Sequence, residues 1–267
     1  MLRFLVVSSC TAEKAYSPER QLQIEDFRHP EILLSREREL APYALPAAEM
    51  YTGDQHRWVM EGINLLRGAF DRGVVDLYIL SAGYGLIPED RIIVPYNVTF
   101  SEMTSAQLRE WAAFLRVRER THEVIRDYPL VIFLLGDHYL KALGLPLEVR
   151  RGQKLLFLST GSAAKGMATH EGHSALAVGP REATEFGCAL VGLKGLLFRH
   201  LASVVVEMGL EVLLEVSARP ELWLDLVARY RKRTLAARAE QLRFPLPEVK
   251  ARKEVRSLDE KGGPAVL

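Results

Sequence analysis

Short runs of apolar residues separated by much longer stretches of chain are the strongest constraint on the fold. Four runs rich in Val, Leu, Ile and Phe lie at residues 2–7, 74–80, 130–135 and 155–158. Such runs are typical of strands buried on both faces of a parallel sheet. Parallel neighbours need long crossover connections, which are usually helical. The sequence therefore predicts an α/β fold with a mostly parallel central sheet flanked by helices.

The connections between these runs supply the helices and loops. A polar stretch with four prolines, residues 15–50, predicts a long excursion with a short helix around 31–40, and residues 163–185 read as loop. Residues 211–216 suggest one more strand. Apolar residues at helical spacing predict helices over residues 54–72, 104–126, 185–208 and 220–242.

Composition excludes several classes of protein. With 48% apolar and 26% charged residues and a net charge of +1, the chain has the balance of an ordinary globular protein without a general affinity for polyanions. Two cysteines are too few for a disulfide framework, and together with the lack of a recognisable signal peptide or apolar span they favour a cytoplasmic location without membrane association. Metal binding is not expected, because no set of Cys or His residues has ligand spacing.

The last part of the chain is the most basic. From residue 219 to 267 there are twelve Lys and Arg against seven Asp and Glu, a net charge of +5 (12 − 7). We expect an α/β domain over residues 1–218 and a helical, basic extension with a polar tail over residues 219–267. The basic run Arg229–Arg233 is either a solvated helix face or a surface that contacts phosphates.

Residues 77–97 carry the densest group of polar side chains after a predicted strand. Ligands of open α/β sheets bind where strands end, so this segment predicts a pocket wall. Its glycines permit close backbone approach, and its acid and amide are candidates to position a water molecule. The candidate residues of this segment are Ser81, Tyr84, Gly85, Asp90, Tyr96 and Asn97.

The other strand ends add further candidates. Cys10, Glu13 and Lys14 follow the first strand, where they form either a ligand-binding loop or a surface turn. Asp137 follows the third strand and could act on a substrate or cap a helix. Hydroxyls, glycine and lysine after the fourth strand suit a phosphate group, although the Walker order is absent; the candidates there are Ser159, Gly161, Ser162 and Lys165.

These segments resemble a family of bacterial and phage proteins of unknown function. The shared features are a cysteine-x-x-x-lysine loop (Cys10, Lys14), a tyrosine-threonine-glycine element at residues 51–53, a strand end at 80–86 and a proline-tyrosine-asparagine turn at 95–97. The resemblance covers roughly residues 2–166. That family is similar to a distant branch of the uracil-DNA glycosylase superfamily and to the glycosylase-like domain of archaeal tRNA-modifying enzymes.

The resemblance implies a uracil-DNA glycosylase-like fold and a DNA glycosylase. Such an enzyme flips a nucleotide out of the duplex and hydrolyses its N-glycosidic bond, and it needs no cofactor. Asp90 or Asn97 is then expected to position the water molecule, with Glu13 and Asp137 as further candidates. The residues expected to hold the base and phosphates are Cys10, Lys14, Ser81, Tyr84, Gly85, Tyr96, Ser159, Gly161, Ser162 and Lys165.

Two departures from the superfamily bear on the substrate. The glycine-x-aspartate-proline-tyrosine motif is absent, and Gly161 stands where a histidine is usual. Both argue against plain uracil and favour a larger or modified base. The family context, and no residue of this chain, adds modified bases of phage DNA as substrates and with them a role in anti-phage defence. Two alternatives stay open: a hydrolase that acts on free nucleosides, nucleotides or tRNA, and a nucleic-acid-binding module without catalysis.

Overall fold

A six-stranded sheet forms the centre of the computed structural model, which describes residues 2–160, 166 and 169–241. The strand order is β4-β3-β1-β6-β7-β8, and only β4 runs antiparallel to its neighbour. The predicted α/β class with a mostly parallel sheet is confirmed. The strands are β1 (Phe4–Ser9), β3 (Val75–Ser81), β4 (Gly85–Pro88), β6 (Leu130–Leu134), β7 (Lys154–Ser159) and β8 (His173–Ala177).

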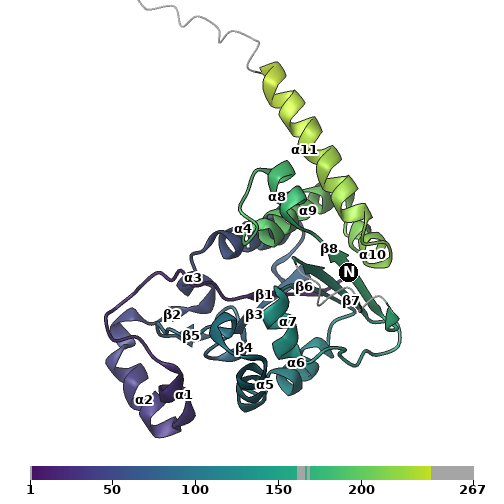
Figure 1. Cartoon of the computed structure of the whole chain (residues 1–267). Coiled ribbons are helices and arrows are strands. Elements are labelled where there is room, and N and C mark those ends of the chain that lie inside the picture. Colours follow the sequence, from purple (N-terminus) through teal and green to yellow (C-terminus); the bar gives the residue numbers. More distant parts are fainter. Residues whose placement is uncertain (1, 161–165, 167–168, 242–267) are drawn as a thin grey trace, which may run out of the picture. The chain divides into compact units, whose positions relative to one another are not determined.

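Helices cover both faces of this sheet (Figure 1). On one face lie α4 (Asp54–Ala69), α9 (Leu193–Met208) and α10 (Glu211–Ala218); on the other lie α5 (Ser105–Phe114), α6 (Val117–Ile125) and α7 (Asp137–Leu143). A Cβ at Gly195 of α9 would overlap the backbone of Gln55, so glycine allows the tight packing of α9 on α4. The strands between these layers are buried on both sides, as their apolar runs require.

Several predicted boundaries differ from the structure. The helix expected over 104–126 is two helices, because Arg116 adopts a left-handed backbone conformation between α5 and α6. Residues 211–216 form helix α10 and not a strand, since Val212, Leu213 and Val216 are buried on one helical face. The stretch 163–185, expected as loop, contains β8 and helix α8 (Pro180–Phe186).

The excursion at residues 15–50 is largely ordered into short elements. The predicted helix around 31–40 is confirmed as α2 (Pro30–Glu39). The excursion packs beside the edge of the main sheet, where β2 pairs with β5 in a small antiparallel sheet. Its remaining elements and the nearby short ones are α1 (Ile24–Arg28), β2 (Leu45–Pro46), α3 (Ala47–Met50), β5 (Ile92–Ile93) and 3₁₀ turns Ala41–Tyr43, Arg72–Val74 and Phe100–Glu102.

The chain divides into two compact units, residues 1–231 and 232–267. The expected helix after Pro220 is α11 (Leu222–Gln241), and its first turns belong to the first unit. Trp223 is fully buried there, and its indole N–H donates to the Leu197 carbonyl at 3.1 Å. None of the helices in the described ranges is long and apolar enough to cross a bilayer.

Candidate functional site

The strand order places a topological switch point between β1 and β6. From β1 the chain moves to β3 on one side, and it then returns to β6 on the other. Helices on the two faces diverge at such a point, and ligands of open α/β sheets bind there, outside the carboxyl ends of the strands. The carboxyl edge at β1 and β6 is therefore the place where geometry alone predicts a site.

Gln55 ties the two strands together at this edge. Its buried amide nitrogen lies 3.3 Å from the Ser8 hydroxyl, 2.9 Å from the Ser9 hydroxyl and 3.1 Å from the Leu134 carbonyl oxygen. Gln55 can reach all three because it is the second residue of α4, whose amino end points at the edge. The floor of the switch point is thus fixed by a satisfied polar network.

A cluster of phenols, one thiol and one hydroxyl lies above this floor. We refer to Cys10, Tyr51, Ser81, Tyr96 and Tyr139 as the phenol cluster. The Cys10 sulfur and the Tyr139 oxygen are 3.1 Å apart, the Tyr51 and Tyr96 oxygens 2.8 Å apart, and Ser81 donates to the Tyr96 oxygen at 2.8 Å. Burial raises the pKa values of all three tyrosines well above the usual value. At neutral pH they therefore remain neutral hydrogen-bond donors.

Lys14 lies against the phenol cluster. Its ammonium is 4.3 Å from the centre of the Tyr96 ring, and it donates to the Ala12 carbonyl at 3.4 Å. Burial lowers the pKa of Lys14, and the nearby Cys10 opposes this shift. An isolated antiparallel β-bridge between the backbones of Lys14 and Tyr51 holds the loop in place. It brings together the cysteine-x-x-x-lysine loop and the tyrosine-threonine-glycine element, which lie far apart in sequence.

A second lysine approaches the same edge from α9. Lys194 is 4% exposed, and burial lowers its pKa to about 8, while the negative charge of Asp137 opposes that shift. Asp137 is the first residue of α7 and is half-buried directly after β6. The pair thus brings an amine and a carboxylate to the switch point.

A hollow of about 320 Å³ lies beside the turn that carries Tyr96, although no residue of the phenol cluster lines it. Asn97 lines it, and the Asn97 backbone N–H donates to Leu22 at 2.8 Å, which holds the turn that also buries Tyr96. Trp111 forms part of its wall, and the Arg28 guanidinium lies 5.4 Å from that indole. Three carboxylates and one guanidinium face the hollow, so it suits a ligand that offers hydrogen-bond donors; the carboxylates are Glu25, Glu102 and Glu110.

One aromatic contact joins the segment that lines the hollow, residues 97–103, to helix α7. Phe100 packs edge-on against Tyr139 with ring centres 5.2 Å apart. Tyr139 lies two residues after Asp137 on the first turn of α7 and reaches Cys10. The segment that lines the hollow therefore packs against the first turn of α7, which carries Asp137.

Tyr84 and Gly85 have structural roles. The Tyr84 hydroxyl donates to Glu37 of α2 at 3.1 Å and accepts from the Val94 N–H at 3.3 Å, and burial raises its pKa. Gly85 has φ +71° at the start of β4, where the chain reverses. The two residues brace the excursion and make the hairpin turn.

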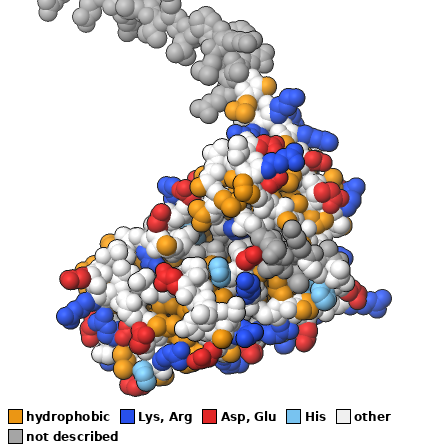
Figure 2. Space-filling view, in the orientation of Figure 1, with side chains coloured by type: hydrophobic (Ala, Val, Ile, Leu, Met, Phe, Trp, Pro, Cys, Tyr) orange, Lys and Arg blue, Asp and Glu red, His pale blue; other side chains and the backbone are white. Residues whose placement is uncertain are grey.

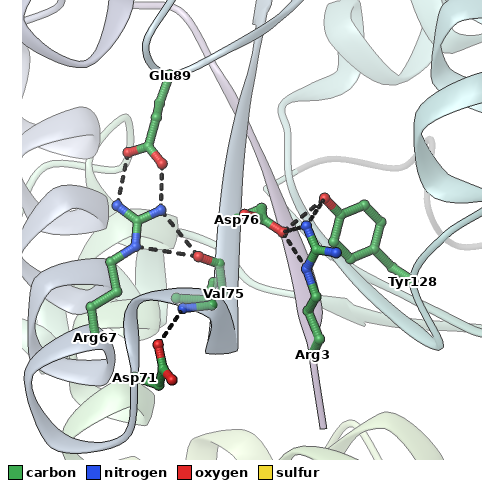
Figure 3. Close-up of polar contacts among 8 residues, drawn as sticks. Arg3, Arg67, Asp71, Val75, Asp76, Glu89 and Tyr128 are labelled. Atoms are coloured by element: carbon green, nitrogen blue, oxygen red, sulfur yellow. Dashed lines mark hydrogen bonds and ion pairs between the residues drawn. The ribbon is translucent and has the colours of Figure 1, made fainter.

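Asp90 does not lie at the carboxyl edge, and its predicted position was wrong. Strand β4 runs antiparallel to β3, with Tyr78 opposite Pro88, so the chain returns to the amino edge before Asp90. There Asp90 lines a separate hollow of about 590 Å³. Its neighbour Glu89 forms a two-pronged ion pair with Arg67, which also donates to the Val75 carbonyl at 3.0 Å (Figure 3).

The remaining predicted residues divide between described and undescribed segments. Glu13 is exposed on the loop after β1, and its carbonyl accepts from the Thr52 N–H at 3.2 Å. Ser159 is buried at the end of β7. Gly161, Ser162 and Lys165 lie outside the described residues.

Tyr51, Gln55, Tyr139 and Lys194 were not predicted as site residues, although Tyr51 belongs to the motif at residues 51–53 and Tyr139 lies two residues after Asp137. Gln55 and Lys194 come from helices that do not directly follow a predicted strand end. A signal did exist for Lys194, because a lone lysine in the apolar run of residues 193–198 indicates a buried cation. Within the described residues no three His, Cys, Asp or Glu side chains gather as a set that could hold a metal ion.

Comparison with protein families gives a match of unknown function. A family of unknown function (DUF6884) matches residues 32–156, which is less than half of the 267-residue chain. No curated protein matches the chain. The matched segment runs from α2 into β7 and includes Tyr51, Gln55, Asn97 and Asp137, so the chain is similar to this family over much of the carboxyl edge.

Proposed function

We propose that the protein is a DNA glycosylase that removes a modified base, with the carboxyl edge at β1 and β6 as its active site. The observation that carries the proposal is the meeting of a carboxylate, a buried amine and buried neutral donors at the switch point, with a hollow beside the turn that carries Tyr96. Catalytic groups concentrate where burial shifts pKa values, as it does for Lys14 and Lys194 here. The resemblance to uracil-DNA glycosylases supports the same edge.

The residues have distinct roles in this proposal. A nucleotide flipped out of the duplex places its base in the hollow, where Asn97 bonds the base edge. Asp137 orients a water molecule towards C1′ and stabilises the cationic sugar that forms as the N-glycosidic bond breaks. The water hydroxyl adds to C1′, its proton passes to Asp137, and the base leaves with the bonding electrons.

The phenol cluster stabilises the leaving base. Negative charge develops on that base as the bond breaks, and preorganised donors in a dry site are the most effective counterparts. Tyr51, Tyr96 and Tyr139 stay protonated because burial raises their pKa values. Lys14 adds a cation beside them and can meet a phosphate next to the flipped nucleotide.

The acidic lining of the hollow argues for a base that carries extra donors. Three carboxylates would repel a phosphate but accept hydrogen bonds from amino or hydroxyl groups. The same lining suits a free nucleoside, which keeps hydrolysis of nucleosides or of tRNA bases as the second candidate.

Abasic-site formation tests the proposal. The purified protein is incubated with normal DNA, uracil-containing DNA and phage DNA with hydroxymethylated or glucosylated cytosines, and released base is measured by mass spectrometry. We expect release from one modified DNA, and a loss of about 10²-fold in Asn97→Ala.

The matched control is Asn64→Ala, on the exposed side of α4, which should release base at the wild-type rate. Release from nucleosides or tRNA and not from any DNA would favour the second candidate. Absence of release from every substrate would contradict the proposal.

A further inference from the structure

A second hollow, of about 280 Å³, lies at the amino edge of β6 and β7, at the opposite end of the strands from the proposed active site. Two loops line it, residues 126–129 before β6 and residues 150–153 before β7. They contribute three guanidinium groups, from Arg126, Arg150 and Arg151, and one carboxylate, from Asp127.

A buried glutamine fixes the two loops against each other. Gln153 is 5% exposed, and its amide nitrogen donates to the Ile125 carbonyl at 2.7 Å and to the Tyr128 carbonyl at 2.8 Å. Its side-chain oxygen accepts a hydrogen bond from the backbone N–H of Arg150 at 3.0 Å. The backbones that carry the arginines are thus held in place before any ligand arrives, which reduces the ordering cost of binding.

The hollow has an excess of positive charge, whereas the charged side chains nearby are paired. At the neighbouring part of the edge, Arg3 pairs with Asp76 at 2.7 Å and Arg67 pairs with Glu89 (Figure 3). Within the described residues, none of the three arginines of the hollow has a carboxylate within ion-pair distance. Asp127 also lies close enough to Arg3 to help raise the pKa of Arg3.

The excess is local and not a property of the whole surface. Acidic and basic side chains are interspersed on the face shown in Figure 2, and the chain has a net charge of only +1. The hollow itself carries +2, from three arginines and one aspartate (3 − 1). Lys154, exposed at the start of β7, adds a further cation next to Gln153.

We propose that this arginine hollow is a phosphate-binding site, separate from the site of base release. Guanidinium groups bind phosphate oxygens through paired N–H donors, and three of them stand here on loops whose backbones are fixed. Its volume lies just below the roughly 300–1,000 Å³ of sites for drug-sized ligands, so it suits one or two phosphate groups. The phosphates come from a nucleic-acid backbone or from a soluble oligophosphate.

The two sites have separable effects. Strands of five or six residues at about 3.3 Å per residue separate the two edges by roughly 17–20 Å. A phosphate held at the arginine hollow therefore cannot touch the base in the active site. It adds affinity without changing the rate of base release at saturating substrate.

The test combines Arg126→Ala, Arg150→Ala and Arg151→Ala in one variant. All three residues are exposed, so the fold should tolerate the changes, which a melting curve checks. The matched control removes three exposed arginines elsewhere, with Arg109→Ala, Arg181→Ala and Arg219→Ala. Affinity for duplex DNA is measured against salt concentration for wild type and both variants, and all three proteins are titrated with pyrophosphate and tripolyphosphate by calorimetry.

Log affinity falls as log salt concentration rises, and we expect this slope to be less steep by about 2 to 3 in the hollow variant. Each lost phosphate contact reduces the magnitude of the slope by about 0.9. The control variant should change the slope by less than about 1. A lowered slope identifies the nucleic-acid backbone as the source of the phosphates. An unchanged slope with oligophosphate binding that only the hollow variant loses identifies a soluble ligand. An unchanged slope without such binding, or equal losses in both variants, overturns the proposal.

Discussion

The two edges of the sheet use polar residues in opposite ways beside β1 and β3. At the amino edge of these two strands, cations meet carboxylates: Arg67 pairs with Glu89, and Arg3 pairs with Asp76, which also accepts from the Tyr128 hydroxyl at 2.8 Å (Figure 3). At the carboxyl edge, neutral phenols, a thiol and a serine bond one another beside lysines whose pKa values are lowered. Ion pairs that satisfy each other hold structure, whereas buried donors with shifted pKa values are typical of functional sites.

The largest effect on stability should come from the buried lysine at the carboxyl edge. Burial lowers the pKa of Lys194 from 10.5 to about 8, so the folded protein holds this proton less tightly than the unfolded chain. Unfolding therefore takes up a proton between these values, and folded wild type gains stability as the pH rises through them. Relative to Lys194→Met, wild type should gain roughly 2 kcal/mol between about pH 7 and pH 9.5.

Urea unfolding at several pH values measures this gain. The control is Lys141→Met on the exposed side of α7, for which the difference in free energy of unfolding from wild type should be the same at every pH. If the difference between wild type and Lys194→Met is also the same at every pH, the Lys194 amine is not desolvated in the folded protein.

A smaller effect should follow from breaking the phenol cluster. Tyr96→Phe removes the oxygen that accepts from Ser81 and contacts the Tyr51 hydroxyl, and it leaves buried polar groups unpaired. We expect a loss of about 1–2 kcal/mol in the free energy of unfolding. Tyr78→Phe, a half-buried tyrosine on β3, should cost less than about 0.5 kcal/mol. Equal costs would remove the distinction between the cluster and an ordinary tyrosine.

The smallest effect is expected at the amino edge. Glu89→Gln weakens the ion pair with Arg67, whose side chain is 18% exposed, and should cost about 1 kcal/mol while base release stays unchanged. Asp54→Asn, which weakens an exposed pair with Arg57, should cost less than about 0.5 kcal/mol. Loss of base release in Glu89→Gln would contradict the division between the two edges.

The fold was more predictable than the site. Continuous apolar runs specify buried parallel strands, so β1, β3, β6 and β7 follow from local sequence. The β3–β4 hairpin was missed because its second strand has only four residues, beginning at Gly85, and therefore looked like a loop. That error moved Asp90 to the wrong edge.

The site was only partly predictable, because it depends on contacts between distant segments. Cys10, Lys14, Ser81 and Tyr96 were identified because they follow strands or lie in a short motif. Gln55 and Lys194 come from helices whose packing fixes which residues face the switch point, and strand ends carry no information about that packing. Only the register of α4 against α9, set at Gly195, brings the two helices to the same place.

The most direct measurement compares Asp137→Asn with Asp90→Asn in single-turnover base release from the DNA that wild type attacks. Both changes remove one carboxylate charge, one at each edge of the sheet. An active site at the carboxyl edge requires a loss of about 10²-fold or more in Asp137→Asn and a wild-type rate in Asp90→Asn. A loss confined to Asp90→Asn would place the chemistry at the amino edge and contradict the assignment made here.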